Sequence, residues 1–348
     1  MPNLKPVLQS KAGLSGWTLC IGAGTSYPMF PNWYALVTDL VSQDIGPDKA
    51  KDIMPSLSNG FGLDALVQAG RDRLGLSSDR FADFLSNRLY AGVNQKLSNA
   101  EWKIFRKGLA VFHPGDMPAS DWTEFQKIVS SHFPSVSATD LASAVVDAED
   151  VGCGPAAIIS FNAEPLLYAL INAQVSMNGP TKQKSLLDRI TRSLSNRTSG
   201  RIPYIFCHGL LPIEGHPSPD WHSIDKLVFS ETEYLQVVNS GFTWQSSTFF
   251  ENCMSRSVVF VGLSFSDPNL RRWLGIMHQN RTRELRSIGR GDVSSAHHYW
   301  FRTVPTSTEE ARWVEAAVAH LGVRLIWLRD WSEAGLALRS ILGISSKA

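Results

Sequence analysis

Short apolar runs alternate with longer helical segments along most of this 348-residue chain, and this alternation limits its fold more than any other feature. The apolar runs have the length of strands, and a helical pattern follows most of them. Strands that alternate with helices form a mostly parallel sheet covered on both faces, so we expect an α/β fold. The expected strands span residues 17–21, 156–161, 203–207, 227–229, 257–262, 298–304 and 323–328.

A long helical region interrupts this alternation. Residues 45–150 contain amphipathic segments and no clear strand signal. We therefore predict a single domain over residues 1–348, in which about 45–150 form an inserted helical subdomain and 151–348 form the remainder of the core. Residues 178–201 are rich in Ser, Thr, Lys and Arg and are expected to form an exposed connection.

Positive and negative charges nearly cancel, with 33 Lys and Arg against 32 Asp and Glu. A chain without a net field is not steered toward nucleic acid or an anionic membrane, so we expect neither as a direct partner. The first residues have no apolar run behind a basic start, and no stretch approaches the ~20 apolar residues of a spanning helix. These features predict a cytoplasmic protein.

The four cysteines are far apart in the sequence and form no C-x-x-C pair. This spacing favours neither a zinc site nor a disulfide framework, so no metal is expected. Free cysteines are usually buried, and we expect free thiols in a reducing cytoplasm. The four are Cys20, Cys153, Cys207 and Cys253.

The first expected strand meets a helical segment through a glycine-rich turn, Gly22-Ala23-Gly24-Thr25-Ser26. Glycines there let the backbone approach a pyrophosphate, and free N–H groups at a helix start favour its charge. Ordinary turns between a strand and a helix also use glycine, so the motif alone leaves both interpretations open. The dehydrogenase fingerprint has a third glycine where this chain has Tyr27, which disfavours hydride transfer.

Two polar residues, Asn162 and His208, follow expected strands at the edge where open α/β sheets bind ligands. Asn162 is not needed as a helix cap, because Pro165 fits the first helical position and places the cap at Glu164. A solvated side chain is the alternative for a lone asparagine. A lone histidine is also compatible with a packing or surface role, although its titration near neutral pH suits it to proton transfer.

The expected strand at residues 257–262 leads into a polar loop that ends at Asp267. Backbone N–H groups and serine hydroxyls such as that of Ser264 can hold phosphate or ribose oxygens in such a loop. Asp267 can equally serve only as the cap of a helix that begins at Pro268. The arginines that follow form either a solvated face or a local basic patch: Arg271, Arg272, Arg281, Arg283, Arg286 and Arg290.

The four strand ends together resemble the sirtuin-like domains of bacterial anti-phage defence proteins. In order, they carry Gly-Ala-Gly-Thr-Ser, Phe-Asn-Ala-Glu, Cys-His-Gly and Gly-Leu-Ser-Phe-Ser-Asp-Pro-Asn-Leu. The resemblance implies a Rossmann-like sheet and an NAD site, with Asn162 and His208 at the catalytic centre. It places near the cofactor Gly22, Ala23, Gly24, Thr25 and Ser26, while Gly262, Ser264 and Asp267 complete the ribose and phosphate wall.

The chain departs from the family pattern at two points. Protein-deacylating sirtuins usually carry four zinc-binding cysteines after the His-Gly motif, whereas only Cys253 follows it here. Deacylation is therefore disfavoured as an activity. The asparagine motif usually ends in Asp where this chain has Glu164, so the family's role is carried over to Asn162, and the role of Glu164 is left open.

The resemblance implies an NAD glycohydrolase that releases nicotinamide and ADP-ribose and depletes NAD during phage infection. A sensor that binds NAD or ADP-ribose without turnover is the alternative, although it would need neither Asn162 nor His208. A third alternative is a scaffold subunit that assembles with an ATPase, an Argonaute-like protein or a nucleotide hydrolase encoded beside it. The 11 Trp and 17 Phe favour a homo-oligomer or such a complex, because aromatic residues are enriched at interfaces.

Overall fold

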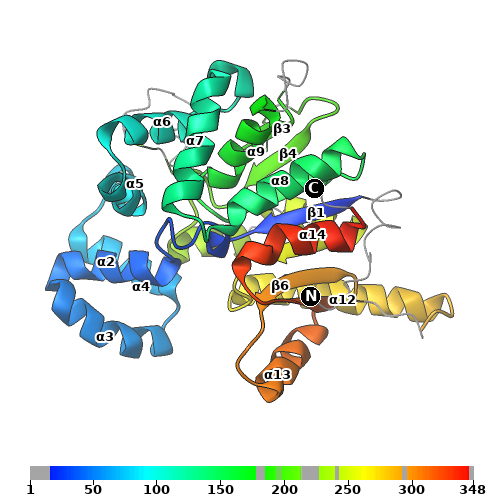
Figure 1. Cartoon of the computed structure of the whole chain (residues 1–348). Coiled ribbons are helices and arrows are strands. Elements are labelled where there is room, and N and C mark those ends of the chain that lie inside the picture. Colours follow the sequence, from blue (N-terminus) through cyan, green and yellow to red (C-terminus); the bar gives the residue numbers. More distant parts are fainter. Residues whose placement is uncertain are drawn as a thin grey trace.

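The computed structural model describes residues 16–177, 185–193, 195, 197–211, 213, 227–239, 243–291 and 296–344. Over these residues the chain forms a seven-stranded parallel sheet enclosed by helices (Figure 1). The expectation of an α/β fold with a mostly parallel sheet is confirmed. No helix within the described ranges is long and apolar enough to cross a bilayer.

The strand order across the sheet is β3-β4-β2-β1-β5-β6-β7. The chain first builds one half of the sheet beside β1 and then crosses to β5 on the other side, which is a Rossmann-like topology. Sheets of this kind bind ligands at the carboxyl ends of the strands where the order reverses. The strands are β1 (Trp17–Ile21), β2 (Ala157–Ser160), β3 (Leu187–Ile190), β4 (Ile202–Phe206), β5 (Ser257–Val261), β6 (His298–Thr303) and β7 (Val323–Leu328).

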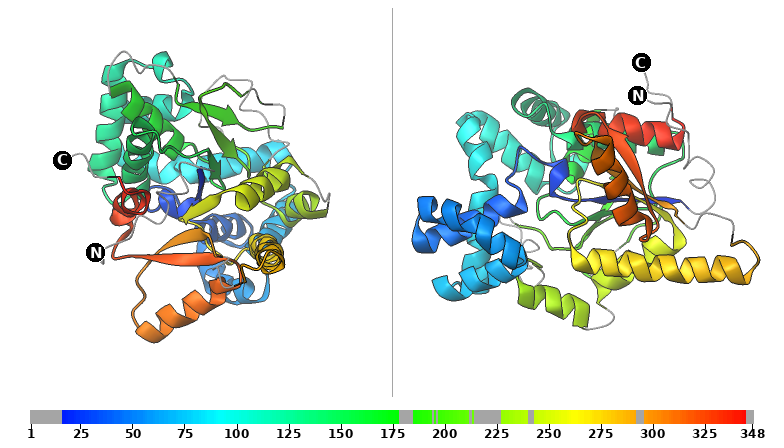
Figure 2. Two further views of the ribbon diagram at one scale, coloured as in Figure 1. Left: turned by 90° about the vertical axis from the view of Figure 1, so that its right-hand side faces the viewer. Right: turned by 90° about the horizontal axis from the view of Figure 1, so that it is seen from below.

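Many helices lie between β1 and β2 in the sequence, and Figures 1 and 2 show α2, α3 and α4 as a group that projects beside the sheet. The helices of this stretch are α2 (Trp33–Ile45), α3 (Pro47–Gly60), α4 (Leu63–Leu74), α5 (Ser78–Lys96), α6 (Asn99–Ala110), α7 (Ala119–His132) and α8 (Ser137–Asp150). Those that follow are α9 (Leu166–Met177), α10 (Glu231–Asn239), α11 (Trp244–Ser255), α12 (Pro268–Ser287), α13 (Thr308–Ala319) and α14 (Ala334–Leu342).

The central strands are buried on both faces, as their unbroken apolar sequences require. Alternate residues of β1 enter different cores: Leu19 and Ile21 pack with α8, α9 and α14, whereas Cys20 packs with α11 and α12 on the opposite face. Many aromatic side chains fill these cores, including Trp17 and Trp122. The aromatic content therefore does not by itself require an intermolecular interface.

Two sequence predictions about strands are wrong. Residues 227–229 are not in the sheet, because the run is too short to pair and only Val228 donates to the His208 carbonyl, at 3.2 Å. Residues 187–190, expected in an exposed connection, form the edge strand β3. Two charged residues in its centre interrupt the apolar pattern that predicts a strand. In the structure Asp188 pairs with Arg201 at 3.3 Å, and Arg189 lies over the Phe112 ring.

Candidate active site

The candidate residues gather at one edge of the sheet. Residues 22–26 follow β1, Asn162 follows β2, His208 follows β4, and residues 262–267 follow β5. These four strands are neighbours and parallel, so their carboxyl ends meet at the same edge. The structure thus assembles four motifs that are far apart in the sequence.

The glycine turn packs backbone against backbone with the loop after β5. A Cβ atom at Gly22 would lie 2.7 Å from the Gly262 carbonyl oxygen, and one at Gly24 would lie 2.8 Å from the Gly262 Cα. Gly262 has a φ of +66°, and its own Cβ would collide with the Thr25 backbone nitrogen. Glycine is therefore required at all three positions by the close approach of two loops, whatever binds beside them.

Most backbone N–H groups of this turn are already used inside the protein. Four of them donate to carbonyl oxygens of the turn itself, of Val261 or of Gly262: those of Gly22, Gly24, Thr25 and Ser26. Within the part of the chain that the structure describes, only the exposed Ala23 contributes an N–H group without such a bond. The expectation of free N–H groups at this helix start is therefore wrong for four of the five residues, because their N–H groups form hydrogen bonds within the protein.

Asn162 is buried, with 4% of its surface exposed, so the solvated alternative is wrong. Its side-chain nitrogen donates to Glu164 Oε1 at 2.9 Å and reaches the hydroxyls of Thr25 (3.2 Å) and Ser26 (3.3 Å). Its amide oxygen has no hydrogen-bond partner among the described residues. A buried acceptor of this kind is costly unless a water or a ligand group donates to it, so it is a candidate contact for a reactant.

Glu164 is the anchor of this network and is 5% exposed. Its Oε1 accepts from the Ser26 hydroxyl and from Asn162, while its Oε2 accepts from the Leu166 N–H at 2.5 Å, at the start of α9. Burial raises the pKa of Glu164 to about 7, although the hydrogen bonds from Ser26, Leu166 and Asn162 lower it. The carboxyl therefore changes charge in the neutral range.

His208 is half-buried and is surrounded by aromatic rings. Its ring meets that of Phe161 edge-on, with centroids 4.8 Å apart, and that of Tyr234 at 5.4 Å. Burial lowers the pKa of His208 to about 4, against a hydrogen bond to the Phe161 backbone that raises it. The imidazole is therefore neutral at pH 7, which is the state that can accept a proton.

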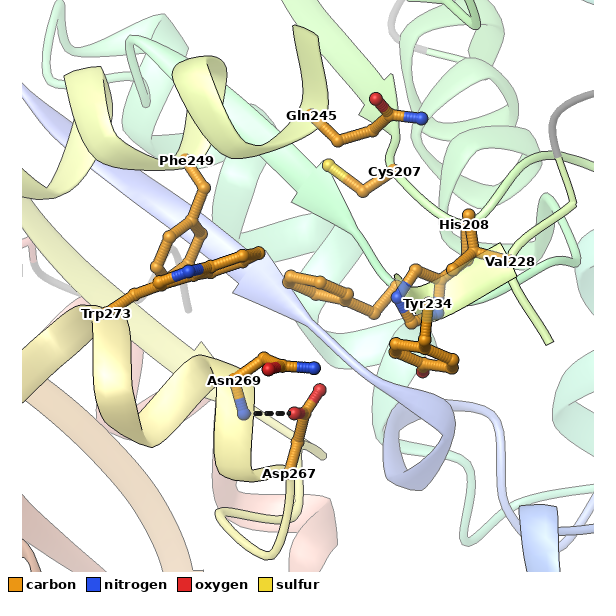
Figure 3. A pocket seen from close by; sticks show the side chains of 10 residues that line it. Cys207, His208, Val228, Tyr234, Gln245, Phe249, Asp267, Asn269 and Trp273 are labelled. Atoms are coloured by element: carbon orange, nitrogen blue, oxygen red, sulfur yellow. Dashed lines mark hydrogen bonds between the residues drawn. The ribbon is translucent and has the colours of Figure 1, made fainter. Parts of the chain in front are cut away.

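A small pocket opens beside His208 (Figure 3). Trp273 of α12 and Phe249 of α11 form one wall, His208 and Tyr234 form the other, and Asp267 lies between them. Its volume of about 20 Å³ has room for about one water molecule. Admission of a larger planar group requires side chains of these walls to move.

Asp267 both lines this pocket and caps α12. Its Oδ1 accepts from the N–H groups of Asn269 (2.8 Å) and Leu270 (3.3 Å), as the sequence predicted for a cap. Burial raises its pKa, although these two hydrogen bonds lower it. Ser264, by contrast, is exposed and outside the pocket wall, and its hydroxyl pairs with that of Ser266 at 2.6 Å.

Comparison with known protein families identifies the domain. Residues 167–325 match the family model described as a SIR2-like domain. The chain contains a sirtuin-like domain. The match begins in α9 and ends in β7, so it includes His208 and Asp267. No match was found among curated proteins.

The match to a sirtuin-like domain supports NAD-related chemistry in general terms. The glycine turn and Asn162 precede the matched segment. Their association with the sirtuin-like domain rests on the sheet, which places them beside the matched residues at one edge.

The fold brings together three cysteines that are distant in the sequence. Cys20, Cys207 and Cys253 share one buried cluster, where burial raises the pKa of each thiol, that of Cys207 to about 12. Neutral thiols are poor metal ligands. In the described ranges no group of three or more His, Cys, Asp or Glu side chains could hold a metal ion. A zinc-free protein stays a prediction, which elemental analysis can check.

Sequence reasoning missed the aromatic walls of the pocket. Tyr234, Phe249 and Trp273 belong to three different helices, and no spacing in the sequence links them. It also left Glu164 without a functional role, although the residue stands only two positions after Asn162. Proximity to the asparagine motif was the one available signal.

Proposed function

We propose that this chain hydrolyses the bond between nicotinamide and ribose in NAD and releases nicotinamide and ADP-ribose. One observation carries the proposal. The β2–β4 register ends at the pair of Ser160 and Phe206, so Asn162 and His208 each follow the end of one of two neighbouring parallel strands, at the same edge of the sheet. Side chains that follow neighbouring strands at the carboxyl edge of an open sheet line the same ligand-binding crevice, so an amide and an imidazole there can act on one reactant.

The reaction needs orientation and a proton acceptor. When nicotinamide leaves, the electron pair of the broken C–N bond neutralises its ring, and the ribose carbon develops positive charge. The unpartnered oxygen of Asn162 can accept a hydrogen bond from the attacking water or from a ribose hydroxyl and so orient it. Neutral His208 can take the proton that is released as water adds, and such base catalysis typically contributes about 10²–10⁴-fold.

A second candidate is a domain that binds NAD or ADP-ribose as a sensor. The pocket beside His208 has room for about one water, so its walls must move to admit the ligand of a sensor or of an enzyme alike. The retained pair of Asn162 and His208 favours the enzyme, because a sensor needs no proton acceptor beside an orienting amide.

The purified protein should release nicotinamide from NAD, and Asn162→Ala and His208→Ala should lower kcat by orders of magnitude with little loss of NAD affinity. Asn172→Ala is a matched control, because Asn172 is also fully buried with an unpartnered amide oxygen but lies within α9. If both site variants keep the wild-type kcat, the site assignment is wrong. Affinity for NAD without any nicotinamide release would support the sensor.

The biological setting is part of the proposal. We place the activity in the cytoplasm, as the NAD-depleting effector of an anti-phage defence system that acts as a homo-oligomer or with a protein encoded beside it. That partner would be an ATPase, an Argonaute-like protein or a nucleotide hydrolase. The assay above, repeated with the product of the neighbouring gene, tests whether the partner switches turnover on.

A further inference from the structure

The Glu164 carboxyl has no step in the chemistry proposed above, yet it holds the Asn162 side chain. We propose that Glu164 is a positioning residue that selects which end of the Asn162 amide, the oxygen or the NH₂ group, faces the reactant. The consequence for turnover rests on the proposed function, because the orientation of Asn162 matters only if Asn162 orients a reactant. The orientation itself can be measured without any activity.

Three donors converge on the Glu164 carboxyl. The Leu166 N–H occupies Oε2, while the Asn162 NH₂ and the Ser26 hydroxyl both occupy Oε1. An ionised carboxylate has only acceptor sites and satisfies all three donors. With the NH₂ group held there, the Asn162 oxygen must point away, and this is the oxygen that has no partner among the described residues.

Protonation of Glu164 removes this preference. A neutral carboxyl carries one O–H donor. Because the Leu166 N–H occupies Oε2, the proton belongs on Oε1, which faces both the Ser26 hydroxyl and Asn162. The Ser26 hydroxyl can turn and accept this proton, so the proposal requires that the new O–H group is directed at Asn162. A donor at that position repels the Asn162 NH₂ group, whereas an amide rotated by 180° accepts from it through its oxygen. The rotated amide presents a donor to the reactant where the ionised form presents an acceptor.

Two phenols lie in the electrostatic surroundings of Glu164. They are Tyr90 from α5 and Tyr204 from β4. Burial raises the pKa of both phenols well above the usual range, so both stay neutral. Burial also raises the pKa of Glu164 to about 7. The Asn162 amide should therefore rotate as the pH crosses neutrality.

A glutamine at this position should hold the amide in its rotated form. The Leu166 N–H requires an oxygen as its partner, which turns the oxygen of the new side chain toward Leu166 and its NH₂ group toward Asn162. That NH₂ group then donates to the Asn162 oxygen. Glu164→Gln therefore imitates the protonated carboxyl at every pH while it preserves the size of the side chain.

The direct test is the Asn162 side-chain amide in ¹⁵N NMR spectra of protein labelled at asparagine, with its signal assigned by its loss in Asn162→Ala. In the wild type the signal should shift with one midpoint near pH 7, and in Glu164→Gln it should stay at the acid-side position. Glu149→Gln removes another carboxyl whose pKa burial raises, but in α8 outside the network, and should keep the wild-type midpoint.

A pH-independent Asn162 signal in the folded wild type would overturn the proposal. This outcome needs only the wild-type protein, so the test stands even if Glu164→Gln fails to fold. A midpoint that persists unchanged in folded Glu164→Gln would overturn it too, because another group would then control the amide.

Turnover of NAD provides a second measurement. Wild-type kcat should fall about tenfold per pH unit below the midpoint. Glu164→Gln should be about 100-fold slower than the wild type at about pH 8, with little change in KM and without this pH dependence. Unchanged turnover in Glu164→Gln would overturn the positioning role. A wild type that releases no nicotinamide overturns the proposed function instead, and the NMR titration still decides the orientation.

Discussion

The Asn162 side-chain nitrogen donates to Glu164 Oε1 at 2.9 Å, and both residues are at least 95% buried. This hydrogen bond couples the amide that we expect to orient a reactant to a carboxyl whose pKa burial raises to about 7. We regard the network as a candidate functional site, because a carboxyl in a low-dielectric region is present at a cost in stability. The size of that cost is measurable.

Glu164→Gln should change how stability depends on pH. The folded-state pKa of Glu164 is raised above the unfolded value of 4.5, so its contribution is fully present below pH 4.5 and is lost as the pH rises to about 7. Glu164→Gln has no carboxyl at this position and does not lose stability in this way. The difference in free energy of unfolding between the variant and the wild type should therefore rise by about 3 kcal/mol as the pH increases from 4.5 to about 7. Urea unfolding at several pH values measures it, with the exposed Glu309→Gln as the control for loss of one negative charge.

His208→Gln should show the opposite sign. The folded-state pKa of His208 is lowered from 6.5 to about 4, so the neutral ring contributes stability above pH 6.5 that is lost as the pH falls toward 4. The variant should therefore gain stability relative to the wild type on acidification through this window. The same urea series decides the matter, and a difference between His208→Gln and wild type that stays constant with pH would mean that the ring is solvated.

Much of the sheet was predictable because buried parallel strands are nearly pure apolar sequence. β1, β5 and β7 lie where the apolar runs predicted them, and the polar residues that follow β2 and β4 were placed correctly at the carboxyl edge. β3 was not predictable, since Asp188 and Arg189 are satisfied by an ion pair and an aromatic ring that only the fold supplies.

The interior of the site was less predictable than its outline. Asn162 and Glu164 are two positions apart in the sequence, but the sequence does not reveal that both side chains bond to Ser26, which follows a different strand. The role of Gly262 was also hidden, because its contact with Thr25 joins two loops separated by most of the chain. Contacts of this kind depend on strand order, which local patterns do not specify.

Gly262→Ala should destabilise the protein strongly. The residue has a φ of +66°, and an added Cβ would collide with the Thr25 backbone nitrogen, so the strained backbone and the overlap should together cost about 3 kcal/mol. Gly60→Ala is the matched control, because nothing lies within 4 Å of its Cβ position in α3, and it should be neutral or stabilising by up to about 1 kcal/mol. Equal urea midpoints for the two variants would refute the close packing of the two loops.

Asp267→Asn should separate binding from chemistry in the proposed reaction. Asparagine also caps helices well, so α12 should keep its start and the fold should survive. The substitution removes a carboxylate from a pocket that His208 shares, and nicotinamide is cationic in NAD until its bond breaks.

The loss should therefore raise KM about tenfold and leave kcat within a few-fold, unlike Asn162→Ala. Ser264→Ala should also act on KM rather than kcat, and by less, because its hydroxyl is exposed, bonded to Ser266 and outside the pocket wall. Steady-state kinetics of nicotinamide release measures both variants. If Asp267→Asn lowers kcat at unchanged KM, then Asp267 stabilises the transition state rather than bound NAD.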